Sequence, residues 1–250
     1  MALWKDGSAP SVSDLVRYEN GIGDLASTES INLAEKILLA RQEVGSSLFR
    51  FLLDQGALAE TASDLPDVAV TEPLQRWVTL KALALTYREA HFSNLSERYK
   101  GKWTEYSQQA FLTGREYFET GVGRVTGPVG KPGAPTIAQA AGALPANTYY
   151  VAITWVTAQG VESEGSEVAV RVTSEPATII ASHSAAPLAA SGWNVFAGIA
   201  DNDLGKQNVG PISIGSSWTL PAGGLIAGVA PGQGQLAEYY IRARRSLQRG

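Results

Sequence analysis

The chain has 250 residues, of which 20 are basic and 24 acidic, giving a net charge of −4, and it contains no cysteine. This length accommodates one large domain or two of ordinary size. The lack of cysteine excludes disulfides, thiolate nucleophiles and cysteine-based zinc sites, and the mild acidity argues against a polycation built for nucleic acid. With no basic leader and no apolar run near about 18 residues, we expect no signal peptide and no membrane span, and folding in the cytoplasm.

Two helices are expected before residue 57. Leu15, Tyr18, Ile22 and Leu25 recur at helical spacing and predict a short amphipathic helix, which Gly21 and its neighbours weaken. The second helix has Asn32 and Glu35 at the spacing of a capping box and ends at Gly56. Its apolar stripe consists of Ala34, Ile37, Leu38, Arg41, Val44, Leu48, Phe51 and Leu52.

Two longer helices should follow and form a helical hairpin. The first begins at Pro73, where the missing N–H costs little, and runs to about Phe92 with apolar residues on most of its surface. The second covers Asn94 to Thr120, and one of its faces is aromatic from end to end. We expect the large rings of this pair to form a bundle core, chiefly Trp77, Tyr87, Tyr99, Trp103 and Tyr106.

The pattern changes after Gly121. Residues 121–146 are rich in Gly, Pro and Ala and are interpreted as a linker. Apolar residues then alternate with a period of two, which indicates strands. The strands are expected at Thr148–Thr157, Glu167–Thr173, Thr178–Ser182, Gly192–Ala197 and Ile212–Leu220. Short strands about ten residues apart predict a β-sandwich of immunoglobulin (Ig) or fibronectin type III kind, here without a cysteine pair.

A helical period returns at the end of the chain, where Leu236, Tyr239, Tyr240, Ala243 and Leu247 form a stripe. The predicted fold is therefore α+β and multidomain. A bundle of about four helices occupies residues 1–125, the sandwich 126–233, and a basic C-terminal helix 234–250 that returns to the bundle. This last segment has one Glu and four arginines: Arg242, Arg244, Arg245 and Arg249. Positively charged side chains stabilise a helix C-terminus, but four arginines together suggest a surface that binds an acidic protein groove or nucleic acid.

No pattern for catalysis or cofactor binding is present. His91 lies on the apolar face of a predicted helix and is interpreted as a core residue, and His183 as a turn residue. The acidic turn 201–205 has the start of a calcium loop but lacks its later Glu, so we expect an ordinary hairpin loop. We expect a protein that is not an enzyme and that carries no cofactor and no metal.

Three stretches resemble structural proteins of tailed bacteriophages. Residues 3–44 (LWKDGSAPSVSDL…LLARQEV) resemble bundles of phage and prophage structural proteins. Residues 74–111 (LQRWVTLKALALTYREAHFSNLSERYKGKWTEYSQQAF) look like the helical hairpin of head–tail connector adaptors. The segments YYVAITWVTAQGVESEGSEVAV, GWNVFAG and PISIGSSWTL are similar to Ig-like modules inserted into virion proteins.

The resemblance implies a ring of twelve copies beneath the portal of the capsid, in the neck of the virion, bound to the portal protein and to a stopper or tail protein. Double-stranded DNA would pass through it without sequence-specific binding. The C-terminal segment would dock on the portal through Tyr239, Tyr240, Arg242, Arg244, Arg245 and Arg249, and the aromatic hairpin would also supply the seam between subunits. The sandwich is a departure from the adaptor pattern and would decorate the outside or contact other neck components.

Two alternatives remain open. The chain could be another neck, tail or baseplate protein with the same module. It could instead be a module that binds carbohydrate or a cell surface through exposed aromatics of the sandwich, with helices that serve to oligomerise it. Tyr150, Trp193 and Trp218 are the candidate aromatics for such a surface, although we favour a core position for all three.

Overall fold

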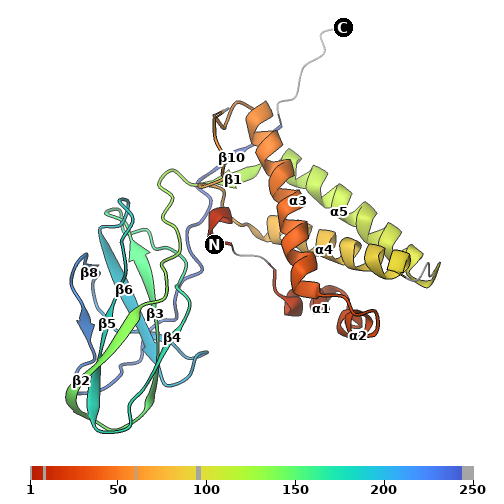
Figure 1. Ribbon diagram of the computed structural model, residues 1–250. Helices are drawn as coiled ribbons and strands as arrows, with labels where there is room; N and C mark the ends of the chain where they lie inside the picture. The colour runs from red at the N-terminus through yellow and green to blue at the C-terminus, as the bar shows by residue number, and fades with distance from the viewer. Residues whose placement is uncertain (1, 8–9, 60, 94–96, 244–250) are drawn as a thin grey trace. The chain divides into compact units, whose positions relative to one another are not determined.

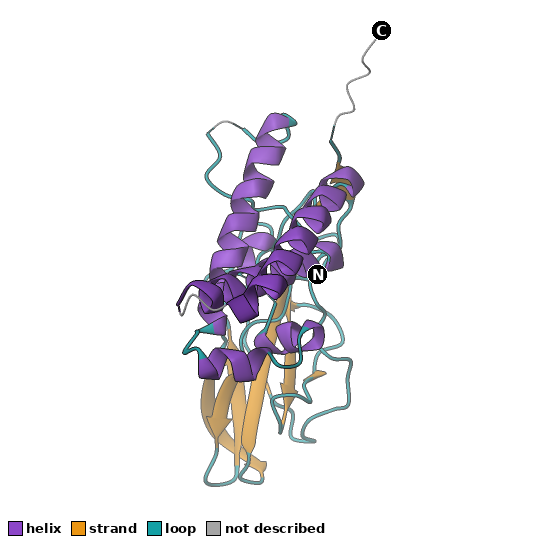
Figure 2. Ribbon diagram, turned by 90° about the vertical axis from the view of Figure 1, so that its right-hand side faces the viewer, coloured by secondary structure: helices purple, strands orange, loops and turns teal. Residues whose placement is uncertain are grey.

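The computed structural model describes residues 2–7, 10–59, 61–93 and 97–243. The fold is α+β, as predicted, with helices mostly in the first half of the chain and sheets mostly in the second (Figures 1 and 2). The chain forms two compact units. The helical unit comprises Gly7–Arg124 and the segment from Ala237 onward, and the sandwich unit comprises Met1–Asp6 and Val125–Leu236. The first six residues, which the sequence placed with the helices, thus belong to the sandwich unit.

The single short helix expected near the N-terminus is two helices, α1 (Val12–Tyr18) and α2 (Ile22–Thr28). Ser11 and Asp14 form a reciprocal capping box at the start of α1. Gly21 occupies the N-cap of α2, so the glycine that was expected to weaken one helix separates two. Gly ends a helix readily because its backbone loses more conformational entropy on becoming helical than the backbone of any other residue.

The three long helices are α3 (Leu33–Asp54), α4 (Glu72–Ser93) and α5 (Lys100–Thr120), the last preceded by the short 3-10 helix η2 (Glu97–Tyr99). Asn32 caps α3 by accepting the N–H of Glu35 at 3.3 Å, as its spacing predicted. Helix α4 is buried on most of its surface and packs against both α3 and α5. The proposed start of α5 at Asn94 lies outside the described residues.

The helical unit also contains a two-stranded antiparallel sheet, β1 (Val122–Arg124) with β10 (Tyr239–Ile241). The predicted C-terminal helix is therefore wrong over these residues, because Tyr239–Ile241 is extended and Gly123 pairs with Tyr240. Tyr and Ile favour strands, and β1 supplies the hydrogen-bonding partner that the sequence pattern could not reveal. The prediction that the segment returns to the helices holds.

The sandwich unit consists of two antiparallel sheets and the short 3-10 helix η1 (Trp4–Asp6). One sheet has the order β2–β5–β9, with β2 (Thr136–Leu144), β5 (Ala177–Ser182) and β9 (Trp218–Thr219). The other has the order β4–β3–β6–β7, and β8 also pairs with β6. Its strands are β4 (Ala169–Val172), β3 (Thr148–Val156), β6 (Gly192–Gly198), β7 (Gly205–Lys206) and β8 (Ile212–Ser213).

Two strand predictions need correction. The Gly- and Ala-rich segment interpreted as a linker, 121–146, contains β1 and all of β2. Small residues have weak strand propensity, but pairing with β5 from Thr136↔Ser182 onward holds this segment in the sheet. The strand expected at Ile212–Leu220 is two short strands, β8 and β9, which belong to different sheets.

The sandwich core lies between the two sheets. Tyr149, Val151, Ile153 and Trp155 of β3 pack there, together with residues of β5, β6 and β9. Trp193 and Trp218 belong to this core, whereas Tyr150 packs on the other side of β3, against Ala152, Phe196 and Leu204. His183 follows β5, but its ring also contacts Trp155 and Trp193 edge-on.

Candidate docking groove on the helical unit

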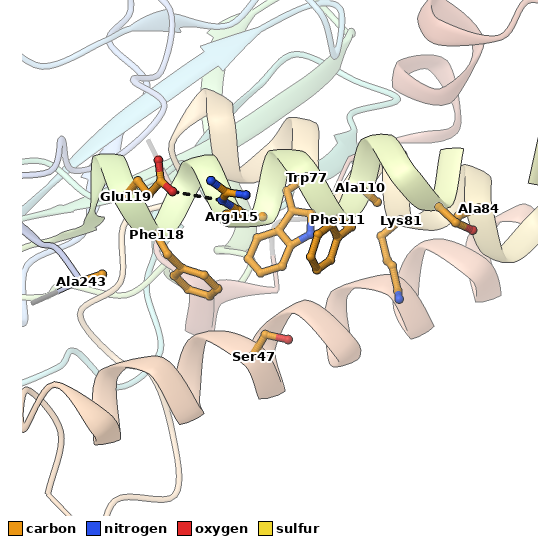
Figure 3. A pocket seen from close by; sticks show the side chains of 12 residues that line it. Ser47, Trp77, Lys81, Ala84, Ala110, Phe111, Arg115, Phe118, Glu119 and Ala243 are labelled. Carbon is orange, nitrogen blue, oxygen red and sulfur yellow. Dashed lines mark hydrogen bonds and ion pairs between the residues drawn. The ribbon is translucent and has the colours of Figure 1, made fainter. Parts of the chain in front are cut away.

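An open apolar groove runs along α4 between α3 and α5. We call it the helical groove (Figure 3). Its main part is a cavity of about 600 Å³ lined mostly by Trp77, Phe111, Phe118 and small side chains. A second hollow of about 610 Å³ shares Ser47 and Phe118 with it and extends toward the end of α3. The two hollows are continuous through Ser47 and Phe118, so the groove extends along α3 beyond its main part.

Aromatic rings form the groove's surface. Trp77 projects from α4, and Phe118 of α5 meets it edge-on with ring centroids 5.3 Å apart. Phe118 also stacks on Phe51 of α3 at 4.4 Å, which joins the two walls at one end. Phe111 stands on α5 one heptad before Phe118 and is 70% exposed, so this ring has little cover within the chain. Trp77 is buried and Phe118 half-buried, so Phe111 is the ring of this group that lies open to water, and an exposed ring beside an apolar hollow is typical of a binding surface.

The charges around the groove are mixed in sign. Lys81 and Glu43 form an ion pair of 2.6 Å between α4 and α3, and Arg115 and Glu119 form one of 3.1 Å within α5. Arg50 and Asp54 lie beside the second hollow. Because both signs alternate along the rim, the groove suits a neutral amphipathic surface better than a polyanion such as DNA.

Most of the predicted aromatic core serves the chain's own packing. Tyr87 and Tyr106 stack with centroids 5.7 Å apart where α4 meets α5, and Tyr99 lies beside Tyr87. Trp103 is half-buried and stacks on His91, which is buried as predicted. Trp77 is the one member of the predicted set that also lines the groove. The sequence missed Phe111 and Phe118, whose seven-residue spacing lies beside the aromatic stripe used for the prediction.

A polar clamp joins α1's C-cap to α5. Glu19 Oε2 accepts hydrogen bonds from Tyr106 Oη and from Lys102 Nζ, both at 2.8 Å. Desolvation raises the pKa of Glu19, but these hydrogen bonds and the charge of Lys102 outweigh it, so the pKa lies below its ordinary value. Desolvation and the Glu19 charge raise the pKa of Tyr87 to about 12. This carboxylate is thus held ionised by partners inside the fold, which suits a structural role.

The residues predicted to contact a portal are only partly described. Tyr239 and Tyr240 are exposed on β10, and as neighbours in a strand they point to opposite sides. Arg124 lies over the Tyr239 ring at 5.9 Å, and Arg242 Nε donates to Thr120 O at 2.9 Å. Arg244, Arg245 and Arg249 lie outside the described residues. The two tyrosines therefore do not form the single helical stripe with Leu236 and Ala243 that the sequence predicted.

Other kinds of site find little support in the described part of the chain. No group of three or more His, Asp or Glu residues there is placed to hold a metal ion. None of the described helices is long and apolar enough to cross a membrane. Trp193 and Trp218, two of the three candidate aromatics for carbohydrate, are buried between the sheets, and Tyr150 is half-buried.

Comparison with known proteins adds no assignment, because no family model, no curated protein and no solved structure matches the chain.

Proposed function

We propose that the chain is a structural subunit of a tailed-phage virion, a head–tail adaptor that forms a ring through its helical unit. The observation that carries the proposal is the helical groove, an open hollow between α3 and α5 lined by Trp77, Phe111 and Phe118. The resemblance of the helical hairpin to connector adaptors supports the same class of protein. In this role the protein performs no catalysis and requires no cofactor.

The occupant of the groove is α3 of a neighbouring copy. Helix α3 turns residues such as Ser47 and Arg50 toward its own groove, but it has a second apolar stripe on another side. This outer stripe consists of Leu38, Phe49 and Leu53, which lie on nearly the same side of α3 with Gln42 and Gly45 between the first two; Phe49 and Leu53 are half-buried. Leu38 is 52% exposed, although it is a large aliphatic residue on a well-formed helix.

Two different complementary surfaces on one subunit produce head-to-tail contacts. Such contacts close into a ring when the rotation between neighbours permits. Burial of a Phe or Leu side chain contributes about 1.5–3 kcal/mol, so Phe111, Leu38 and their neighbours can support a stable interface. We propose a ring of twelve, located in the virion neck, through which double-stranded DNA passes without sequence-specific binding. The portal protein and a stopper or tail protein are its neighbours.

The mass of the assembly tests the ring. The full chain, measured by native mass spectrometry and by light scattering after gel filtration, should form a closed oligomer near twelve subunits, alone or on a portal protein. A chain that stays monomeric at tens of micromolar, both alone and with a portal protein, contradicts the proposal. Specific binding to glycans by such a monomer would favour the carbohydrate-binding alternative.

Point variants test which surfaces meet. Phe111→Glu should block the groove, and Leu38→Glu should block the outer stripe, so neither variant alone should form a ring. A mixture of the two provides one intact groove and one intact stripe, so the two variants should bind each other through that single contact but should still form no rings. Leu112→Glu is the matched control, because Leu112 neighbours Phe111 on α5 but does not line the groove. Rings formed by Phe111→Glu would show that the groove is not the seam.

Portal docking is tested by a chain that ends at Ala243. This truncation keeps β10 and removes Arg244, Arg245 and Arg249, leaving Tyr239, Tyr240 and Arg242 as possible contacts. The truncated chain should still form rings but should lose most of its binding to the portal, with the remainder sensitive to Tyr240→Ala. Undiminished binding of the truncated chain would favour another neck, tail or baseplate position.

A further inference from the structure

Strand β4 forms an accessible edge of the larger sheet in the sandwich unit. Among the described strands it pairs with β3 alone. Val170 and Val172 are 54% and 64% exposed, and Val168 before them is exposed as well. The segment Glu167–Thr173 contains no Pro, Gly or Lys, three residues that often prevent an edge strand from pairing with another chain.

The hydrogen bonds between β3 and β4 determine which backbone N–H and C=O groups of β4 are free to pair with another strand. The N–H of Thr173 donates to Asn147 O, so Thr173 faces β3. In an antiparallel ladder the facing direction alternates, so Arg171 and Ala169 also face β3, while the backbone groups of Val170 and Val172 face away. Within β4 the outward N–H and C=O groups thus belong to Val170 and Val172.

We propose that β4 pairs with β4 of a second copy of this chain, antiparallel, with a two-fold axis at Val170. In this register Val170 lies opposite its own counterpart, and Val168 lies opposite Val172 of the other copy. The Val170 pair uses the outward backbone groups of both copies, and Val172 adds its own. When the pairing extends to Val168, just before β4, six valines form one apolar strip. A register moved by one residue would place an outward-facing residue opposite one that faces β3, which breaks the ladder.

Charge complementarity identifies a second copy as the occupant. Arg171 of β4 and Glu167, which lies two residues before the strand begins, are both exposed. The two-fold register brings Glu167 of one copy diagonal to Arg171 of the other, at a separation that long side chains span. The ion pair forms twice, once on each side of the axis. Within one copy, Arg171 Nη2 donates a long hydrogen bond of 3.4 Å to Gln139 Oε1.

Cysteine cross-linking tests the register directly, because the chain has no cysteine of its own. Val170→Cys should give a disulfide-linked dimer on mild oxidation, since opposed Cα atoms lie about 5.5 Å apart in such a pair. Val168→Cys and Val172→Cys should not cross-link alone, because four residues along a strand span about 13 Å. A mixture of these two variants should cross-link with each other.

The experiment is made with the full chain carrying Phe111→Glu, so that it does not depend on the helical groove or on the proposed ring. Val170→Lys in the same background should convert dimers to monomers in sedimentation, while Val209→Lys, at an exposed loop position, should not. Cross-linking of Val172→Cys alone as fast as Val170→Cys would overturn the register. If the Phe111→Glu chain is already monomeric without Val170→Lys, and Val170→Cys gives no cross-link, the proposed pairing itself is wrong.

Discussion

Gly114 of α5 lies directly against the indole of Trp77 in α4, so that a Cβ atom at position 114 would come within 2.6 Å of the ring. This close approach brings the two helices together and sets the depth of the groove. It also shows why a glycine stands in the middle of a long helix, where Gly is otherwise unfavourable.

Gly114→Ala should therefore lower the free energy of unfolding by about 1–3 kcal/mol, because the indole must move from its packed position. Gly101→Ala is the matched control in the same helix, since a Cβ there meets nothing within 4 Å. That change should raise the free energy of unfolding by about 0.4–1 kcal/mol. Urea titrations followed by circular dichroism measure both, and equal effects would contradict the packing argument.

The ion pair between Arg124 of β1 and Asp67 should be important for stability. Both side chains are largely buried, and Arg124 Nη1 also donates to Ala57 O at 2.6 Å. Asp67→Ala leaves the guanidinium without its counter-charge, so we expect a loss of about 3 kcal/mol in the free energy of unfolding. The exposed pair Arg115–Glu119 is the reference, and Glu119→Ala should cost below about 1 kcal/mol.

Acid stability should depend on Glu19. Its pKa is lower in the folded chain than its ordinary value of 4.5, so the stabilisation it gives is complete above that pH and is lost as the pH falls through the folded value. Glu19→Gln should be less stable than the parent at pH 7, and its free energy of unfolding should fall less between pH 7 and about pH 3. Glu116→Gln, an exposed position on α5, controls for the change in net charge. Parallel pH curves for parent and Glu19→Gln would refute this role.

Alkaline stability should depend on Tyr87. Burial first, and the nearby Glu19 charge second, raise its pKa from 10.0 to about 12. A raised folded pKa gives stability that is complete below pH 10 and is lost as the pH rises toward 12. Tyr87→Phe should therefore flatten the decline in unfolding temperature across this range. Tyr18→Phe, at an exposed site, should leave the decline unchanged.

Helices and the long strands of the sandwich were predictable because their signals are local. The Asn32 cap, the Pro73 start and the alternation along β3 each place the decisive residues within a few positions of one another. The same local view placed Tyr239 and Tyr240 on a helix, since their spacing to Leu236 and Ala243 fits a helical stripe. The partner that makes them a strand, β1, lies more than 110 residues earlier in the chain.

The candidate site was predictable only in part for a similar reason. Trp77 belongs to an obvious helical stripe, and its burial followed from that stripe. Phe111 and Phe118 became a groove wall only because α3 stands across from them, and the crossing of α3 with α4 is set by packing over the whole face. In the sandwich, the exposed valines of β4 follow from its position at the edge of the sheet, which the strand's own alternation does not reveal.

The division of the chain between the two units has a consequence for synthesis on the ribosome. Leu3 and Trp4 are buried in the sandwich unit, and Asp6 accepts the N–H of Lys131 at 3.0 Å. At roughly 5–20 residues per second, about 6–25 s separate the translation of these two segments. In the helical unit, β1 likewise has no partner strand until β10 has been synthesised. Neither unit can complete its native contacts from an uninterrupted stretch of nascent chain: the sandwich unit must combine its first residues with a segment that ends at Leu236, and the helical unit is completed only when β10 follows.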